Sequence, residues 1–276
     1  MSDSGSLDSA SAPATAPRPD SPLADRIHPS PNHGKRRGCT KPDSLILHYT
    51  GMAQTSEALL WLANPLSQVS CHYFVFEDCR IWQMVPENRR AWHAGRSSWH
   101  GETDMNSRSI GIEIANAGHD LSKMPPNPGE YPDFPDRQIE AVIALVKDIV
   151  TRWSIPPTRI LAHSDISPGR KVDPGEKFPW ERLAAAGLGL WPAQTAPYPP
   201  KMPAYRLGDE GMPVAALQSM FAKFGYGIEI TGVFDVKTEA VVAAFQRHWR
   251  QGCVDGVADA ETLGVLRALM AGARST

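Results

Sequence analysis

Apolar residues in the first two thirds of the chain fall into short runs that predict alternating strands and helices. Strands are expected over five β-rich runs, at 44–49, 72–76, 80–85, 109–115 and 159–162. Apolar residues at helical spacing predict helices over 55–63 and from Asp136, as N-cap, to Trp153. This alternation predicts an α/β domain with a mixed β-sheet flanked by helices.

The run over 109–115 is the most regular strand pattern in the chain. Ile110, Ile112 and Ile114 recur at every second position, so they share one face of the strand. Glu113 therefore projects from the opposite face, where its carboxylate does not pack in the apolar core and is available for catalysis.

The last third of the chain has a different pattern. Five prolines between Trp191 and Pro203 predict an extended linker over 191–203. Beyond it, three amphipathic stretches predict a second, small three-helix domain over 204–276, with helices at 214–224, 238–249 and 262–270. The first domain is expected over 27–190, after a disordered tail over 1–26 that is rich in Ser, Ala, Pro and Asp.

Charge and composition narrow the choice of partners and compartment. Lys and Arg number 28 against 30 Asp and Glu, a net charge of −2, which excludes nucleic acid as the main partner. No apolar run is long enough to span a membrane, and no secretory signal is visible. We therefore expect a cytoplasmic protein, with the periplasm as the alternative, and four unpaired cysteines; the oligomeric state stays open.

Two of the nine histidines stand where open sheets place their ligand sites. His48 and His163 each end a β-rich run that leads into a loop, and Asp173 follows ten residues after His163 in a loop rich in Gly and Pro. Two imidazoles and one carboxylate form the three-ligand shell of catalytic zinc sites. Spacing alone leaves four other candidate ligands open, namely Asp165, His72, His93 and His100. The positions of the remaining four histidines predict no role in the site; they are His28, His33, His119 and His248.

Five ordered motifs between Pro42 and Trp180 resemble the zinc-dependent N-acetylmuramoyl-L-alanine amidases of the AmpD/AmiD type. They are the segments 47–50, 70–73, 91–95, Asn106 with 109–113, and 163–173. The second half of the chain, with segments 207–211, 232–235 and 244–246, resembles the three-helix peptidoglycan-binding domain. Both resemblances point to the same polymer, the bacterial cell wall.

The resemblance implies roles for five residues. His48, His163 and Asp173 would bind one Zn²⁺ per chain, Glu113 would lie beside the attacking water, and Lys171 would face the scissile carbonyl. These roles agree with the chemistry of the side chains, because a carboxylate can act as general base and an ammonium can stabilise an oxyanion.

The resemblance also implies a reaction and a set of substrate contacts. The expected reaction is hydrolysis of the amide between N-acetylmuramic acid, or its 1,6-anhydro form, and L-alanine in peptidoglycan or muropeptides. His72, His93 and Asn106 are expected to contact substrate or to support the site. The alternative is a non-catalytic peptidoglycan recognition protein, which would lack a zinc ligand, whereas all three candidate ligands are present here.

Overall fold

A six-stranded mixed sheet forms the centre of the first domain. The computed structural model describes residues 18–120, 122, 128–192 and 203–272. The strand order is β1-β5-β4-β7-β3-β8. The strands are β1 (Arg26–Ile27), β3 (Ser44–Tyr49), β4 (Tyr73–Val75), β5 (Ile81–Gln83), β7 (Ser109–Ile114) and β8 (Ile160–Ala162), beside a two-stranded ladder of β2 (His33–Lys35) and β6 (Arg89–Ala91).

The strand β3, next to the edge strand β8, lies parallel to both of its neighbours, β7 and β8. Its register with β7 pairs His48 with Glu113. Ile110, Ile112 and Ile114 lie in one core cluster, and Glu113 projects from the other face of the sheet, as the sequence pattern predicts. The imidazole of His48 and the carboxyl group of Glu113 thus lie on neighbouring residues at the carboxyl ends of adjacent strands.

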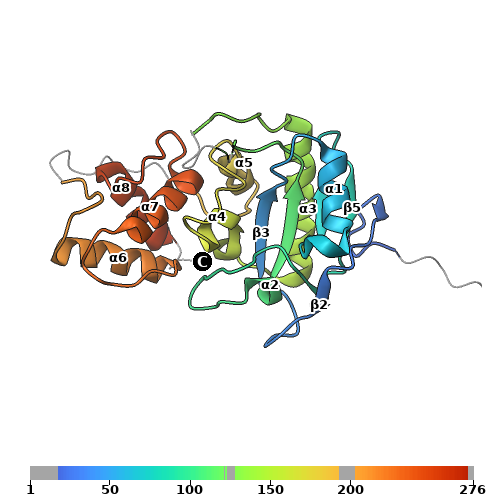
Figure 1. The fold of residues 1–276 in the computed structure, drawn as a ribbon, viewed down its shortest axis with the longest axis horizontal. Helices are drawn as coiled ribbons and strands as arrows, with labels where there is room; N and C mark the ends of the chain where they lie inside the picture. Colours follow the sequence, from blue (N-terminus) through green and yellow to red (C-terminus); the bar gives the residue numbers. More distant parts are fainter. Residues whose placement is uncertain (1–17, 121, 123–127, 193–202, 273–276) are drawn as a thin grey trace, which may run out of the picture.

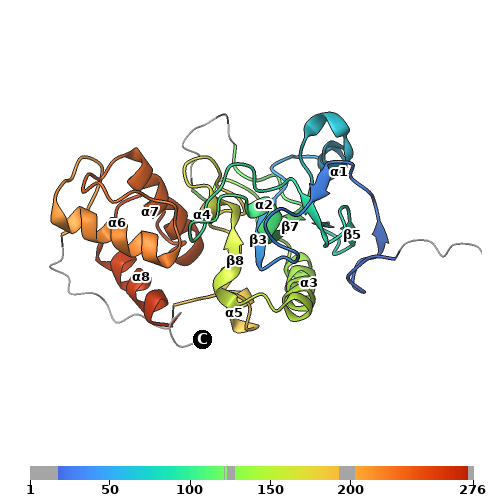
Figure 2. The ribbon, with the colours of Figure 1, turned by 90° about the horizontal axis from the view of Figure 1, so that it is seen from below.

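Two helices cover opposite faces of the sheet (Figure 2). The long helix α3 (Asp136–Trp153) buries Ile139, Val142 and Leu145 against one face, and α1 (Thr55–Ala63) covers part of the other. The predicted N-cap of α3 is wrong by one residue. Pro135 occupies that position, and Asp136 is the first helical residue and pairs with Arg182 at 2.6 Å. The remaining helical segments of the domain are the 3₁₀ turns Pro65–Ser67 and Pro157–Arg159 and the helices α2 (Met105–Arg108), α4 (His163–Ile166) and α5 (Trp180–Ala185).

Three helices form the small C-terminal module, α6 (Met212–Phe224), α7 (Val236–Trp249) and α8 (Ala260–Gly272). Asp235 caps α7, because its Oδ1 accepts a hydrogen bond from the backbone N–H of Thr238 at 2.9 Å. In Figure 1 the module lies beside α4 and α5. Much of the contact is apolar, since Ile46, Leu161 and Ile166 of the first domain share a buried cluster with the three helices. Most of the predicted linker over 191–203 lies outside the described residues.

The disordered tail predicted over 1–26 is wrong for residues 18–26. Residues 18–26 are ordered against the sheet, because the carboxylate of Asp20 accepts hydrogen bonds from Gln83 Nε2 at 2.5 Å and from the backbone N–H of Glu87 at 2.8 Å. The guanidinium of Arg26 lies 3.7 Å from the ring centre of Trp82. These polar anchors, rather than apolar burial, order the segment, which is why a hydrophobicity argument misses it. Residues 1–17 lie outside the described part of the chain.

Two further expectations concern thiols and membranes. All four cysteines are free, as predicted. Among the described residues, no helix combines the length and apolar character that crossing a bilayer requires.

Candidate active site

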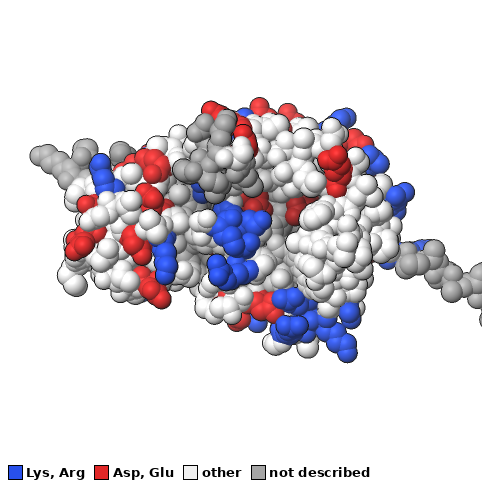
Figure 3. All heavy atoms as spheres, in the orientation of Figure 1, with Lys and Arg blue, Asp and Glu red and all other residues white. Residues whose placement is uncertain are grey.

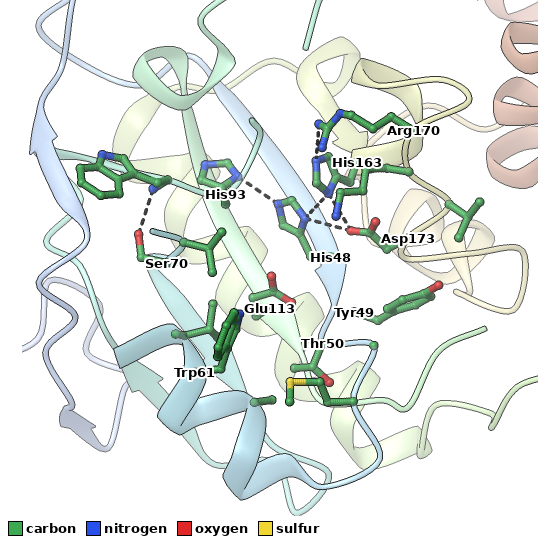
Figure 4. Close-up of a pocket in the computed structure, with 18 residues that line it drawn as sticks. His48, Tyr49, Thr50, Trp61, Ser70, His93, Glu113, His163, Arg170 and Asp173 are labelled. Atoms are coloured by element: carbon green, nitrogen blue, oxygen red, sulfur yellow. Dashed lines mark hydrogen bonds and ion pairs between the residues drawn. The ribbon is translucent and has the colours of Figure 1, made fainter. Parts of the chain in front are cut away.

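The candidate functional residues meet in a pocket of about 300 Å³ at the carboxyl ends of β3 and β7. Helix α1 forms one wall, and the segment from Arg170 to Asp173 forms another (Figure 4). In Figure 3, Lys and Arg side chains border a hollow near the middle of this face, and acidic atoms lie inside it. The pocket therefore combines an apolar wall with charges of both signs.

Two imidazole rings and one carboxylate converge in this pocket, as the sequence predicts. Nδ1 of His48 lies 2.9 Å from Nδ1 of His163. These two nitrogens lie 3.0 and 2.9 Å from Oδ2 of Asp173. All three residues are buried, and their ligand atoms lie within 4.8 Å of one another, which among the described residues makes them a candidate metal-binding group.

Hydrogen bonds to the far side of His48 fix which of its nitrogens faces the pocket centre. Its Nε2 lies 3.0 Å from Nδ1 of His93, and His93 Nε2 lies 3.1 Å from Oγ of Ser109. The hydroxyl of Ser109 donates to the backbone oxygen of Met105 at 2.5 Å. This series of hydrogen bonds ends on a backbone carbonyl oxygen, which can only accept. The Nε2 atoms of His48 and His93 therefore carry the protons, and Nδ1 of His48 presents a lone pair.

His163 is oriented in the same way. Its Nε2 lies 3.1 Å from the backbone oxygen of Ala94, so it donates there, and its Nδ1 faces Asp173. With the other nitrogen of each ring hydrogen-bonded elsewhere, the two Nδ1 atoms and the carboxylate oxygen of Asp173 face one another. This donor set suits a divalent metal ion, because metal-bound histidines commonly donate their second N–H to a carbonyl or similar acceptor.

The electrostatics of the site agree with this assignment. Burial, followed by the neighbouring His163, lowers the pKa of His48 to about 4, so the ring is neutral at pH 7. Burial opposes ionisation of Asp173, but His163 and His48 outweigh it and hold the pKa of that carboxyl below its usual value. A neutral imidazole and an ionised carboxylate are the protonation states that metal ligation requires.

Glu113 and Lys171 line the same pocket. Burial, and then the charge of Asp173, raises the pKa of Glu113 well above its usual value, while Lys171 opposes the shift. Oε2 of Glu113 is buried and has no hydrogen-bond partner among the described residues. An unpartnered carboxylate oxygen beside a candidate metal site is suited to accept a proton from water or substrate.

Three other predicted site residues support the pocket to different degrees. His93 lines it, whereas His72 and Asn106 do not. Oδ1 of Asn106 accepts hydrogen bonds from the backbone N–H groups of His93 and Ala94, at 2.9 and 2.7 Å. Nδ1 of His72 accepts from the backbone N–H of Gly111 at 2.9 Å. These two residues hold the pocket's framework, so their place is behind the wall rather than at the substrate.

The rival ligand candidates lie elsewhere. Asp165 points into the contact with the C-terminal module, where its carboxylate accepts from Tyr226 Oη at 2.8 Å. His100 belongs to the same contact, because its backbone N–H donates to the oxygen of Gly225 at 2.8 Å. Neither residue lines the pocket.

The sequence analysis missed several contributors to the site. Trp61, half exposed on α1, forms part of the pocket wall. The guanidinium of Arg170 donates to the oxygen of Ala94 at 2.6 Å and so braces the loop that holds His163. His119, set aside as incidental, is buried and bridges Tyr49 Oη at 2.9 Å and the carboxylate of Glu176 at 3.1 Å. Only the exposed tryptophan on a short helix offers a pattern that could have been noticed.

The fold and the site define an α/β protein with a candidate metal centre in a cleft, joined to a small helical domain. The family model for N-acetylmuramoyl-L-alanine amidases matches residues 38–176, and a model for a peptidoglycan binding domain matches residues 210–266. The chain belongs to the N-acetylmuramoyl-L-alanine amidase family. The resemblance noted in the sequence is confirmed for both halves.

Individual relatives cover most of the chain. The N-acetylmuramoyl-L-alanine amidase AmiD of Escherichia coli K12 is 38% identical over 242 residues, which cover 82% of this chain and 81% of AmiD. The 1,6-anhydro-N-acetylmuramyl-L-alanine amidase AmpD of Enterobacter cloacae is 32% identical over 181 residues, covering 59% of this chain and 90% of AmpD.

Solved structures agree with the fold over both domains. The complex of E. coli AmiD with anhydro-N-acetylmuramic acid-L-Ala-D-gamma-Glu-L-Lys has a TM-score of 0.73 at 36% identity and covers 86% of this chain and 93% of that one. AmpDh3 of Pseudomonas aeruginosa has a TM-score of 0.70 at 31% identity, with 89% and 95% covered.

Proposed function

We propose that this chain is a zinc amidase that hydrolyses the bond between the lactyl group of N-acetylmuramic acid, or its 1,6-anhydro form, and L-alanine. The observation that carries the proposal is the convergence of His48 Nδ1, His163 Nδ1 and Asp173 Oδ2 in one pocket with Glu113. Support comes from the family and from AmiD, whose structure holds a muramic acid linked to a peptide. Zn²⁺ fits this set of two nitrogens and one oxygen.

The proposed division of labour follows from the side chains. Zn²⁺, when bound, polarises an amide carbonyl and makes water more acidic. Glu113, whose Oε2 has no hydrogen-bond partner in the described part of the chain, takes the proton of the attacking water and delivers it to the departing amine of L-alanine. The half-exposed Trp61 and the rest of the α1 wall give the substrate an apolar surface beside these groups.

Lys171 is proposed to stabilise the oxyanion. Lys171 lines the pocket with His48 and Glu113, and its positive charge disfavours a proton on either side chain. Replacing Lys171 with methionine is expected to lower kcat by about 10²–10³-fold with little change in zinc content, by comparison with the loss of one oxyanion donor. Steady-state kinetics and metal analysis measure both quantities. Lys147→Met, on α3 across the sheet, is the matched control, and equal rates for the two variants would refute the role.

His93 is proposed to orient His48 for metal binding. Replacing His93 with phenylalanine removes the acceptor for Nε2–H of His48, so the affinity for Zn²⁺ should fall by about 10–100-fold. Competition with a chromophoric chelator gives the dissociation constant. His93→Gln keeps an acceptor and should recover part of the affinity. Wild-type affinity in the phenylalanine variant would contradict the proposed role.

Product analysis tests the function itself. The zinc-loaded chain is incubated with an anhydro-muropeptide and, separately, with intact sacculi, and the fragments are analysed by mass spectrometry. We expect peptides that begin with L-alanine, together with unmodified muramic acid, and no such products after removal of zinc by a chelator. Binding without cleavage would favour the recognition protein instead, and the ratio of the two substrates identifies which form is preferred.

The C-terminal module, residues 204–276, is proposed to hold the wall polymer near the pocket. Its support is the match of residues 210–266 to a peptidoglycan binding domain. The presence of all three candidate ligands argues for an enzyme with an attached binding module rather than for a purely recognising protein.

A further inference from the structure

The C-terminal module touches the very turn that carries a candidate metal ligand. Helix α7 packs against α4, the one-turn helix that begins at His163 (Figure 1). The contact includes a buried polar group as well as apolar side chains. Asp165, two residues after His163, is fully buried at this boundary.

The carboxylate of Asp165 joins the two domains. Its Oδ1 accepts a hydrogen bond from Tyr226 Oη at 2.8 Å, and its Oδ2 accepts from Nδ1 of His248 at 2.6 Å. Oδ2 also accepts from the backbone N–H of Ala162 at 2.8 Å. The carboxylate of Asp165 therefore accepts hydrogen bonds from two side chains of the module and from the backbone just before α4.

The two module donors are held rigidly. The ring of His248 is stacked between Trp180 and Trp249, with ring centres 3.7 Å away on each side. The ring of Tyr226 packs against Trp99, with ring centres 5.1 Å apart. Both donors are almost completely buried, so water does not compete for the carboxylate.

Helix α4 connects Asp165 to two of the three candidate ligands. His163 is its first residue, and the backbone N–H of Ser164 donates to the backbone oxygen of Asp173 at 3.0 Å. A shift or tilt of α4 therefore moves His163 directly and releases a hydrogen bond that places Asp173. His48, the third candidate ligand, lies on a separate element, the strand β3.

We propose that Tyr226 and His248 are positioning residues for the metal centre, which they act on through Asp165 and α4. The module thereby supports the chemistry of the first domain in addition to any binding of the wall. The inference rests on the proposed zinc site. It assigns to the module a function that does not require the module to touch the substrate.

Full-length Tyr226→Phe and His248→Phe test this inference, because each removes one donor and keeps an aromatic ring in place. We expect each variant to bind Zn²⁺ about tenfold more weakly, by analogy with other groups that orient metal ligands. The visible spectrum of the Co²⁺-substituted protein should change, and kcat should fall while KM stays near the wild-type value. KM is preserved because the α1 wall of the pocket and Glu113 of β7 are untouched.

Two further variants separate positioning from general stability. Tyr205→Phe alters a tyrosine of the same module that packs on the same apolar cluster, and it should leave zinc affinity unchanged. His248→Asn keeps an N–H donor close to the place of Nδ1, so it should retain more affinity than His248→Phe.

The inference is overturned if Tyr226→Phe and His248→Phe lower the melting temperature but keep the zinc affinity and the Co²⁺ spectrum of the wild type. Failure of the proposed function looks different. In that case the wild-type chain binds zinc without cleaving muropeptides, and the ratio of zinc affinities between variant and wild type still decides whether the module positions the site.

Discussion

Replacing His163 with alanine is expected to abolish both zinc retention and hydrolysis. The substitution removes one of three converging ligand atoms and leaves Asp173 facing a single imidazole. Loss of the metal's contribution, several kcal/mol of transition-state stabilisation, corresponds to a fall in kcat/KM of more than about 10³-fold. Metal analysis after dialysis and the rate of peptide release from a muropeptide measure the two effects.

A matched histidine variant controls for loss of a ring elsewhere. His28→Ala removes a ring that packs on Trp82, away from the pocket, and should keep zinc and activity. Asp173→Asn provides a second ligand variant of nearly the same size, in case His163→Ala folds poorly. If either ligand variant retains wild-type turnover without zinc, the metal mechanism is wrong.

Replacing Glu113 with glutamine is expected to lower kcat by about 10²–10⁴-fold while zinc remains bound, because the amide cannot accept a proton. Glu113 is not one of the converging ligands, so the metal content should not change. Steady-state kinetics and metal analysis on the same preparation separate the two effects. Glu57→Gln, on the exposed side of α1, is the control and should behave as wild type.

The pH profile gives an independent check on Glu113. Burial and the charge of Asp173 raise the pKa of this carboxyl above its ordinary 4.5. A general base must be ionised, so kcat/KM should fall as the pH drops through this raised pKa. The acid limb of the pH profile should therefore lie above pH 4.5. An acid limb that remains unchanged in the residual activity of Glu113→Gln would assign it to another group.

The sequence predicts most of the fold because its local patterns are strong. The strand over 44–49 and the helix over 55–63 appear with the predicted bounds. The alternation of Ile110, Ile112 and Ile114 correctly places Glu113 on the opposite face. In these segments propensity and burial favour the same structure, so no tertiary contact overrides the pattern.

His48 and His163 could be singled out from the sequence because each ends a β-rich run, and the family resemblance adds Asp173 to them. Spacing alone could not eliminate the rival candidates. Spacing cannot show that Asp165 turns towards the C-terminal module while Asp173 turns towards His163. The choice depends largely on long-range contacts, those of Asp165 with Tyr226 and His248 and that of Asp173 with His48. It becomes visible only when the chain is folded.

Supporting residues were the hardest to predict. His248 looks like one more polar position on a helix, yet it is buried and donates to Asp165 across the domain boundary. Gly111 carries a weak signal, since a glycine inside a strand often marks a close approach. A Cβ there would lie 2.4 Å from the ring of His93, so the glycine makes room for the histidine that orients His48.

A crystal structure of the zinc-loaded protein, with anomalous diffraction measured at the zinc edge, tests the central claim most directly. We predict one strong anomalous peak within about 2.0–2.2 Å of His48 Nδ1, His163 Nδ1 and Asp173 Oδ2. A fully loaded protein whose zinc lies elsewhere, or whose three side chains point away from the peak, would contradict the account.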